Sequence, residues 1–169
     1  SLSLVTLRKL GAELIPLELP NYPVGDMTII LSAEAATAFD ELTRNGKDDT
    51  MVRQIKNAWP NSFRASRFIP AVEYLQANRL RTKLIQDMET KLKDIDVYIS
   101  PAFGNANLTL TNLSGHPCVV LPNGFRPEGR PTSITFMGKL FGEGKLLEVA
   151  KIYQNATDFH KKHPEWLKK

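Results

Sequence analysis

The sequence predicts an α/β fold, in which a β-sheet is covered by helices. Apolar residues recur every three or four positions through 69–93, as they do on the buried face of a long helix. Three short apolar runs, at 96–100, 118–122 and 131–137, have the length of strands. Helices that accompany short strands in this way form layers around a common core.

The chain opens with a predicted helix that leads into a predicted strand. Leu4, Leu7 and Leu10 share one helix face, and Gly11 supplies the residue that commonly follows a helix C-terminus. The alternating stretch ELIPLEL then predicts a strand over Glu13–Leu19. The first residues resemble the middle of an amphipathic helix and not its start, so we expect the natural chain to begin upstream.

A second helix is expected over Thr28–Leu42, with Asp26 or Thr28 as its cap. Its apolar face would carry Leu31, Ala35, Ala38, Phe39 and Leu42. The polar stretch at 44–50, RNGKDDT, predicts a loop. The weak pattern through 51–65 predicts an irregular stretch with one short helix.

The second half of the chain predicts a long amphipathic helix over Ile69–Lys93 and then the three strands. Pro101 follows the first strand and cannot donate to a sheet ladder. The run CVVLP is the kind that is buried on both faces of a mixed or parallel sheet. The segment NGFRPEGRP predicts a turn that joins this run to PTSITFM. A last helix is expected over Leu146–His160.

Between the first two strands lies TNLSGHP, which the residues alone predict to be a tight loop at the edge of the sheet. Asn112 can bond to its local backbone, and Gly115 can adopt a positive φ. Pro117 keeps His116 extended as the chain enters the next strand. These properties explain a loop without naming a reaction.

The composition is that of one ordinary globular domain, which we place at 1–169. The 169 residues are 42% hydrophobic and 24% charged. Cys118 is the only cysteine, so no internal disulfide can form. Much of the net charge of +4 lies in KKHPEWLKK, a solvated tail that predicts no nucleic-acid partner. No apolar run approaches the roughly 20 residues of a membrane span, and cytoplasmic localisation is the default expectation.

Nucleophile motifs are missing from the sequence, which contains no G-x-S-x-G elbow and no S-x-x-K pair. Cys118 beside His116 leaves open a thiol nucleophile, although a cysteine that opens an apolar strand is expected to be buried and inert. Asp158, His160 and His163 resemble metal ligands in spacing. They stand among lysines, so a solvated helix end is expected there and no metal site is predicted.

One family nevertheless fits nearly the whole chain, and two motifs carry the likeness. Asn112, Gly115 and Pro117 form Asn-x-x-Gly-x-Pro, and Phe141 with Glu143 forms a Phe-x-Glu helix start after a Gly-x-Pro-led strand. The chain resembles the C-terminal portion of an amidase-signature hydrolase, similar to an amidase or to the A subunit of a glutamyl-tRNA amidotransferase. The resemblance implies a mixed sheet covered by helices.

The resemblance also implies hydrolysis of carbon–nitrogen bonds other than peptide bonds, without a metal or organic cofactor. Family members use a Ser, cis-Ser and Lys triad in a Gly/Ser-rich signature. Here only Ser114-Gly115 joins those two residue types, so no catalytic residue is expected in this chain and the chain alone should be inactive. Pro101, Phe103 and Asn112 are implied as part of the pocket for a small-molecule amide.

The alternative is a non-catalytic binding or interaction module derived from an amidase fold. Such a module would use the face that the rest of the fold would otherwise cover. That face would expose apolar side chains, and self-association through it is expected.

Overall fold

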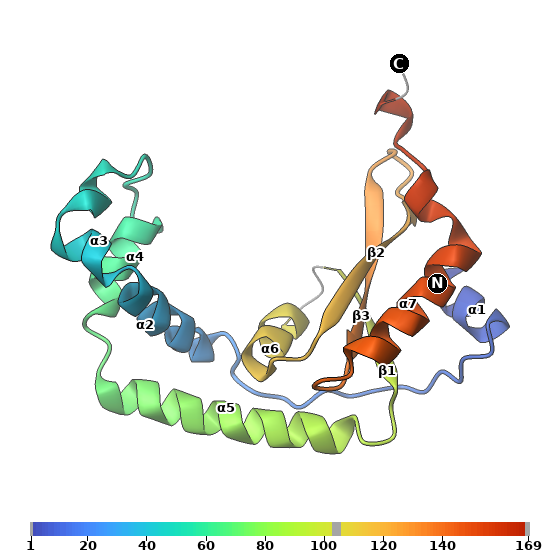
Figure 1. Cartoon of the computed structure of the whole chain (residues 1–169), viewed down its shortest axis with the longest axis horizontal. Helices are drawn as coiled ribbons and strands as arrows, with labels where there is room; N and C mark the ends of the chain where they lie inside the picture. Colours follow the sequence, from blue (N-terminus) through green and yellow to red (C-terminus); the bar gives the residue numbers. More distant parts are fainter. Residues whose placement is uncertain (1, 103–105, 168–169) are drawn as a thin grey trace. The chain divides into compact units, whose positions relative to one another are not determined.

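The computed structural model describes residues 2–102 and 106–167, and within them three strands form one antiparallel sheet. They are β1 (Val97–Pro101), β2 (Cys118–Phe125) and β3 (Pro131–Gly138). Strand β3 is central and pairs with β1 on one side and β2 on the other (Figure 1). The strands coincide with the three apolar runs, and the predicted α/β class is confirmed.

The chain divides into two units, Ser1–Pro20 with Gln86–Lys169 and Asn21–Ile85. Helix α5 (Ala71–Lys91) begins in the second unit and ends in the first. This is the predicted long helix, and the residues buried along it and just past its end keep the predicted spacing: Ala77, Leu84, Met88 and Leu92.

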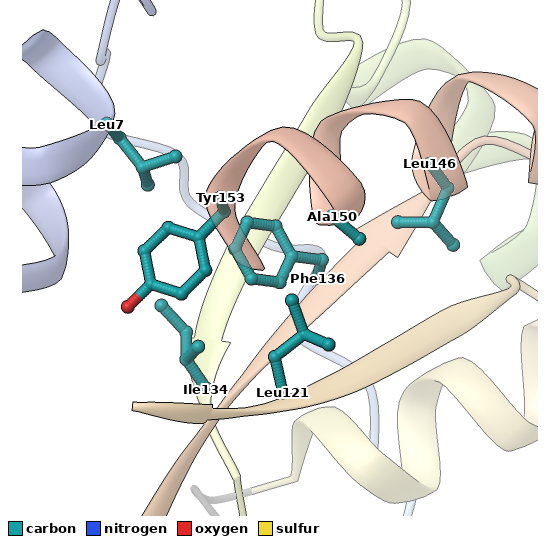
Figure 2. Packing of buried hydrophobic residues seen from close by; sticks show 7 residues of the cluster. All are labelled: Leu7, Leu121, Ile134, Phe136, Leu146, Ala150 and Tyr153. Atoms are coloured by element: carbon teal, nitrogen blue, oxygen red, sulfur yellow. The ribbon is translucent and has the colours of Figure 1, made fainter. Parts of the chain in front are cut away.

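In the unit that contains the sheet, α1 (Leu2–Lys9) and α7 (Glu143–Thr157) contribute to a core on one sheet face. Figure 2 shows the buried side chains that meet there: Leu7, Leu121, Ile134, Phe136, Leu146, Ala150 and Tyr153. The rings of Phe136 and Tyr153 have centroids 5.2 Å apart. Both predicted terminal helices are confirmed.

Helix α7 ends three residues before the predicted end, because Asp158 adopts a left-handed conformation with φ of 53°. Two short 3-10 turns follow, η3 (Phe159–Lys161) and η4 (Glu165–Leu167). In this part of the chain, as elsewhere among the described residues, every helix is too short or too polar to cross a lipid bilayer.

The predicted hairpin between β2 and β3 is confirmed and its turn lies within the predicted segment, although β2 continues to Phe125, beyond the predicted strand end. Asn123-Gly124 forms a bulge inside β2, where Gly124 has φ of 123°. The turn itself is closed by the Arg126 N–H, which donates to the Arg130 carbonyl at 2.8 Å. Gly129 supplies its positive φ of 80°.

The prediction that CVVLP is buried on both faces is wrong. Leu121 is buried in the core beneath α7, whereas Cys118 and Val120 are exposed. Successive side chains of a strand point to opposite faces. Only one face of β2 is therefore covered along its length by the described helices.

The predicted strand Glu13–Leu19 is also wrong, since this segment has no regular structure. Ile15 is exposed, and Leu14 is partly buried against the core cluster. Pro16 has no N–H to donate, which disfavours a place inside a sheet ladder. Leu14, which contacts the core, is out of phase with the alternating Ile15, Leu17 and Leu19, so the alternation does not mark a buried strand face.

The Asn21–Ile85 unit begins with η1 (Asp26–Thr28) and α2 (Ile29–Ala38), followed by α3 (Asp40–Arg44). The predicted single helix breaks at Phe39, whose φ and ψ of −107° and 22° leave the helical range. The predicted apolar face is wrong as well. Leu31 and Phe39 are exposed, whereas Ile30 and Ala36 are buried.

Next come η2 (Lys47–Thr50), an irregular stretch and α4 (Trp59–Ser66), so the predicted short helix is confirmed. The ring of Phe63 on α4 is buried between those of Phe39 and Trp59, with centroid distances of 5.1 and 5.5 Å. The residue at which α2 ends thus also supplies an aromatic contact to α4.

A polar cluster fixes the stretch between α3 and α4. Arg64 Nε lies 2.7 Å from the buried Asp48 carboxylate, and its guanidinium also pairs with Asp49. The Gln54 amide donates to the carbonyls of Asp48 and Met51, each at 2.8 Å. Side chains therefore supply the order that regular secondary structure does not supply here.

Candidate substrate-binding wall at helix α6

The segment that leads into β2 contains a helix, α6 (Asn107–Ser114), so the prediction of a loop around Asn112 is wrong. Leu110 and Leu113 are buried. Gly115 ends the helix with φ of 80°, and its N–H donates to the Thr111 carbonyl at 2.8 Å. The predicted positive φ of Gly115 is thus confirmed, in the role of a helix cap.

The N-terminal end of α6 is tied to the sheet through Asn107. The Tyr98 hydroxyl donates to Asn107 Oδ1 at 3.0 Å, and Asn107 Nδ2 lies 3.7 Å from Met137 Sδ. Burial raises the pKa of Tyr98, so its hydroxyl stays protonated and able to donate. Tyr98 and Met137 belong to the sheet face opposite the α7 core, and α6 lies on that side in Figure 1.

The C-terminal end of α6 is tied to the start of β2 through Ser114 and His116, both buried. Ser114 Oγ lies 2.9 Å from the Leu110 carbonyl and 2.8 Å from His116 Nδ1. A hydroxyl has one proton to donate. Since a carbonyl can only accept, Ser114 donates to Leu110, and His116 Nδ1–H donates to Ser114.

This arrangement selects one tautomer of a neutral imidazole. The proton of His116 lies on Nδ1, and Nε2 is a buried acceptor without a hydrogen-bond partner among the described residues. Burial lowers the pKa of His116 below its ordinary 6.5, and the negative charge of Glu89 opposes that shift. His116 is therefore neutral at pH 7.

The Ser114–His116 pair does not have the geometry of an activated nucleophile. In such a pair the hydroxyl donates to the histidine, which removes its proton as the hydroxyl attacks. Here the proton of Ser114 is directed to Leu110, and the hydroxyl is buried. The hydrogen bond between Ser114 and His116 has a structural role and connects the end of α6 to the segment that enters β2.

Cys118 is exposed, so the expectation of a buried thiol is wrong. The reason is its place on the β2 face that the α7 core leaves uncovered. His116 Nδ1 is occupied by Ser114, and Nε2, the remaining acceptor, makes no hydrogen bond to Cys118 or to any other described residue, so the structure contains no Cys118–His116 pair poised for thiol activation.

Two of the three residues predicted to line a pocket lie on consecutive described elements. Pro101 is exposed at the last position of β1, and Asn112 is exposed on α6. Phe103 lies outside the described residues. Because α6 is tied at both ends, the amide of Asn112 projects from a fixed helix.

Sequence reasoning missed Leu108, which is exposed on α6 four residues before Asn112. Residues four apart lie on the same side of a helix. The exposed side of α6 therefore presents one apolar group beside one amide. Recognition of α6 as a helix, from the spacing of Leu110 and Leu113 before Gly115, would have revealed this pair.

No potential metal centre of three or more His, Cys, Asp or Glu side chains occurs in the described parts of the chain. Asp158 pairs instead with Lys161 at 2.8 Å. That ion pair lowers the pKa of the Asp158 carboxyl, mainly through the hydrogen bond from Lys161.

Comparisons with known proteins relate the chain to amidases. No protein-family model matches it. The A subunit of glutamyl-tRNA(Gln) amidotransferase from Enterococcus faecalis is 30% identical in an alignment that covers 94% of this chain and 40% of that protein. The corresponding protein of Trichormus variabilis is 28% identical, with 94% and 41% covered. The chain thus spans about two fifths of the length of these curated relatives.

Solved structures share the fold. An allophanate hydrolase of Kluyveromyces lactis matches with a TM-score of 0.70 and 20% identity, over 92% of this chain and 28% of that chain. A 6-aminohexanoate cyclic dimer hydrolase matches with a TM-score of 0.72 and 17% identity, over 98% and 42%.

These findings confirm the resemblance of the chain to the C-terminal portion of amidase-signature proteins. More particularly, the chain is homologous to part of the A subunit of glutamyl-tRNA(Gln) amidotransferase.

Proposed function

We propose that the chain acts as the C-terminal part of an amide hydrolase that cleaves carbon–nitrogen bonds other than peptide bonds. The observation that carries this proposal is the homology to an amidotransferase protein over 94% of the chain but only 41% of the relative. Activity then depends on the longer protein. Its substrate would be a small-molecule amide, cleaved in the cytoplasm without a metal or organic cofactor.

Within that enzyme the chain supplies strands of the sheet and one wall of the substrate pocket. Pro101 at the end of β1 and Asn112 on α6 are the proposed contacts, together with Phe103, which lies outside the described residues. Ligands of α/β proteins commonly bind beyond strand ends. The amide of Asn112 can donate to and accept from an amide substrate, and its helix is tied to the sheet through Asn107 and to β2 through Ser114.

The Ser, cis-Ser and Lys triad is proposed to lie outside this chain, so the chain alone is inactive. Ammonia or amine release from amides tests this with the complete natural gene product and with the isolated chain. The complete product is expected to turn over and the isolated chain is not. Turnover by the isolated chain that Ser114→Ala abolishes would overturn the proposal.

The contact through Asn112 is tested by Asn112→Ala in the complete product. Loss of one hydrogen bond to the substrate should raise KM by about tenfold with kcat little changed. The matched control is Asn155→Ala, because Asn155 is exposed on α7. Equal changes of KM in the two variants would show that Asn112 does not contact the substrate.

A binding or interaction module remains the second candidate, and exposed apolar side chains of the Asn21–Ile85 unit support it. They include Leu31, Trp59, Phe68, Val72 and Leu75. Self-association through such a surface would appear in analytical ultracentrifugation as a mass that rises with concentration. A concentration-independent monomer that binds no hydrophobic dye would count against this candidate.

A further inference from the structure

Phe141 combines two unusual properties in the turn between β3 and α7. Its φ is 59°, in the left-handed region that a residue with a Cβ atom rarely adopts. Its side chain is 94% exposed. A backbone conformation of this kind persists where the surrounding structure enforces it, and such positions are often functional.

The turn that carries Phe141 is held on both sides. The Lys139 ammonium donates to the Lys93 carbonyl at 2.6 Å, and the Gly142 N–H donates to the Lys139 carbonyl at 2.9 Å. A Cβ on Gly142 would lie 3.0 Å from that same carbonyl oxygen, so the turn is tight. The contacts of Lys139 and Gly142 therefore hold the backbone from which the exposed phenyl ring projects.

We infer that the ring of Phe141 is an anchor that inserts into an apolar pocket of the polypeptide corresponding to the rest of the relatives' length. The chain spans about two fifths of those relatives, so most of such a protein is available to cover the ring. Aromatic side chains that fill pockets dominate the energetics of interfaces. The inference rests on the proposal that the chain works within a longer amidase.

The inference is tested by thermal unfolding of the complete natural gene product with Phe141→Gly. The informative result is the sign of the change in Tm relative to the unsubstituted protein. Glycine adopts a positive φ without strain. If the ring of Phe141 is not buried in the complete protein, the substitution relieves that strain without loss of a contact and raises Tm. Loss of a buried anchor should instead lower Tm, by roughly 4 °C or more. A raised or unchanged Tm overturns the inference. Phe141→Ala is the matched variant, expected to lie below Phe141→Gly because alanine keeps the backbone strain.

A photo-crosslinking phenylalanine analogue at position 141 identifies the occupant. In the purified gene product the expected crosslink joins position 141 to a residue that precedes Ser1. A crosslink between two copies, or none, overturns the inference. Amide hydrolysis is measured on the unsubstituted gene product. An inactive product whose Tm falls with Phe141→Gly refutes the proposed function alone, whereas an active product whose Tm rises refutes the anchor alone.

Discussion

The phenolic oxygen of Tyr153 lies 3.1 Å from Ser3 Oγ, which joins residues 150 positions apart through a buried hydrogen bond. Asn123 Nδ2 donates to the same Ser3 oxygen at 3.0 Å, and Thr132 donates to Asn123 Oδ1 at 2.8 Å. The bulge in β2 occurs beside Asn123. One short polar network thus holds α1 and α7 to the β2–β3 hairpin.

Ser3→Ala should lower the free energy of unfolding by about 1–3 kcal/mol, because Tyr153 and Asn123 both lose a buried acceptor. Tyr153→Phe should cost less, since it removes the donor itself. Urea unfolding of both variants and the double variant measures the coupling. Additive effects of the two substitutions would show that the hydrogen bond does not link α1 to α7.

Substitution of Asp48 and substitution of Arg64 should lower the free energy of unfolding by different amounts. The Asp48 side chain is only 3% exposed and that of Arg64 is 37% exposed. Arg64→Met leaves a buried carboxylate without its cation, and we expect a loss of about 2 kcal/mol. Asp48→Asn should cost less, because Arg64 keeps its pairing with Asp49. Chemical denaturation checks this order, and a larger loss for Asp48→Asn would contradict it.

His116 predicts a loss of stability in mild acid. Because its folded pKa is below the ordinary 6.5, the unfolded chain binds the proton more tightly between the two values. Its contribution to stability is complete above about pH 6.5 and falls as the pH falls toward the folded pKa, by at most about 1.4 kcal/mol per pH unit.

The measurement is the free energy of unfolding between pH 7.5 and 5. His116→Asn should flatten the dependence relative to the wild-type chain. The carboxyls of Asp40 and Asp158, whose pKa values lie below 3.8, titrate outside this window. An equal slope in wild type and His116→Asn would exclude the histidine as its source.

Exposure of Cys118 predicts ready alkylation in the folded protein. Iodoacetamide should label it at roughly the rate found for the urea-unfolded chain, within about tenfold. Mass spectrometry at timed intervals follows the reaction. A labelling rate in the folded protein that is lower by several orders of magnitude would show that the thiol is buried, as the sequence pattern indicates.

Periodicity in the sequence predicted the elements that bury one clear face. The spacing of Leu84, Met88 and Leu92 marks α5, and PTSITFM marks β3. The alternation at Glu13–Leu19 is misleading, because this segment contains Pro16, has no regular structure and contacts the core through Leu14, which is out of phase with the alternating residues. Local patterns alone cannot separate these cases, because the partner that receives the apolar side chains decides between them.

The candidate site was predicted only in part, for a related reason. The sequence predicts the positive φ of Gly115, but the Asn and Thr residues of α6 have low helix propensity and therefore indicate a loop. Packing of Leu110 and Leu113 and the ties of Asn107 and Ser114 stabilise that helix. Such contacts depend on residues distant in the sequence.

Whether the chain is part of a working amidase is tested by the sequence of the reading frame upstream of the codon for Ser1. We expect the frame to continue into a lysine and a Gly/Ser-rich run with paired serines, which together would supply the triad. A start codon immediately before Ser1 would refute the proposed function, because this polypeptide would then lack the triad.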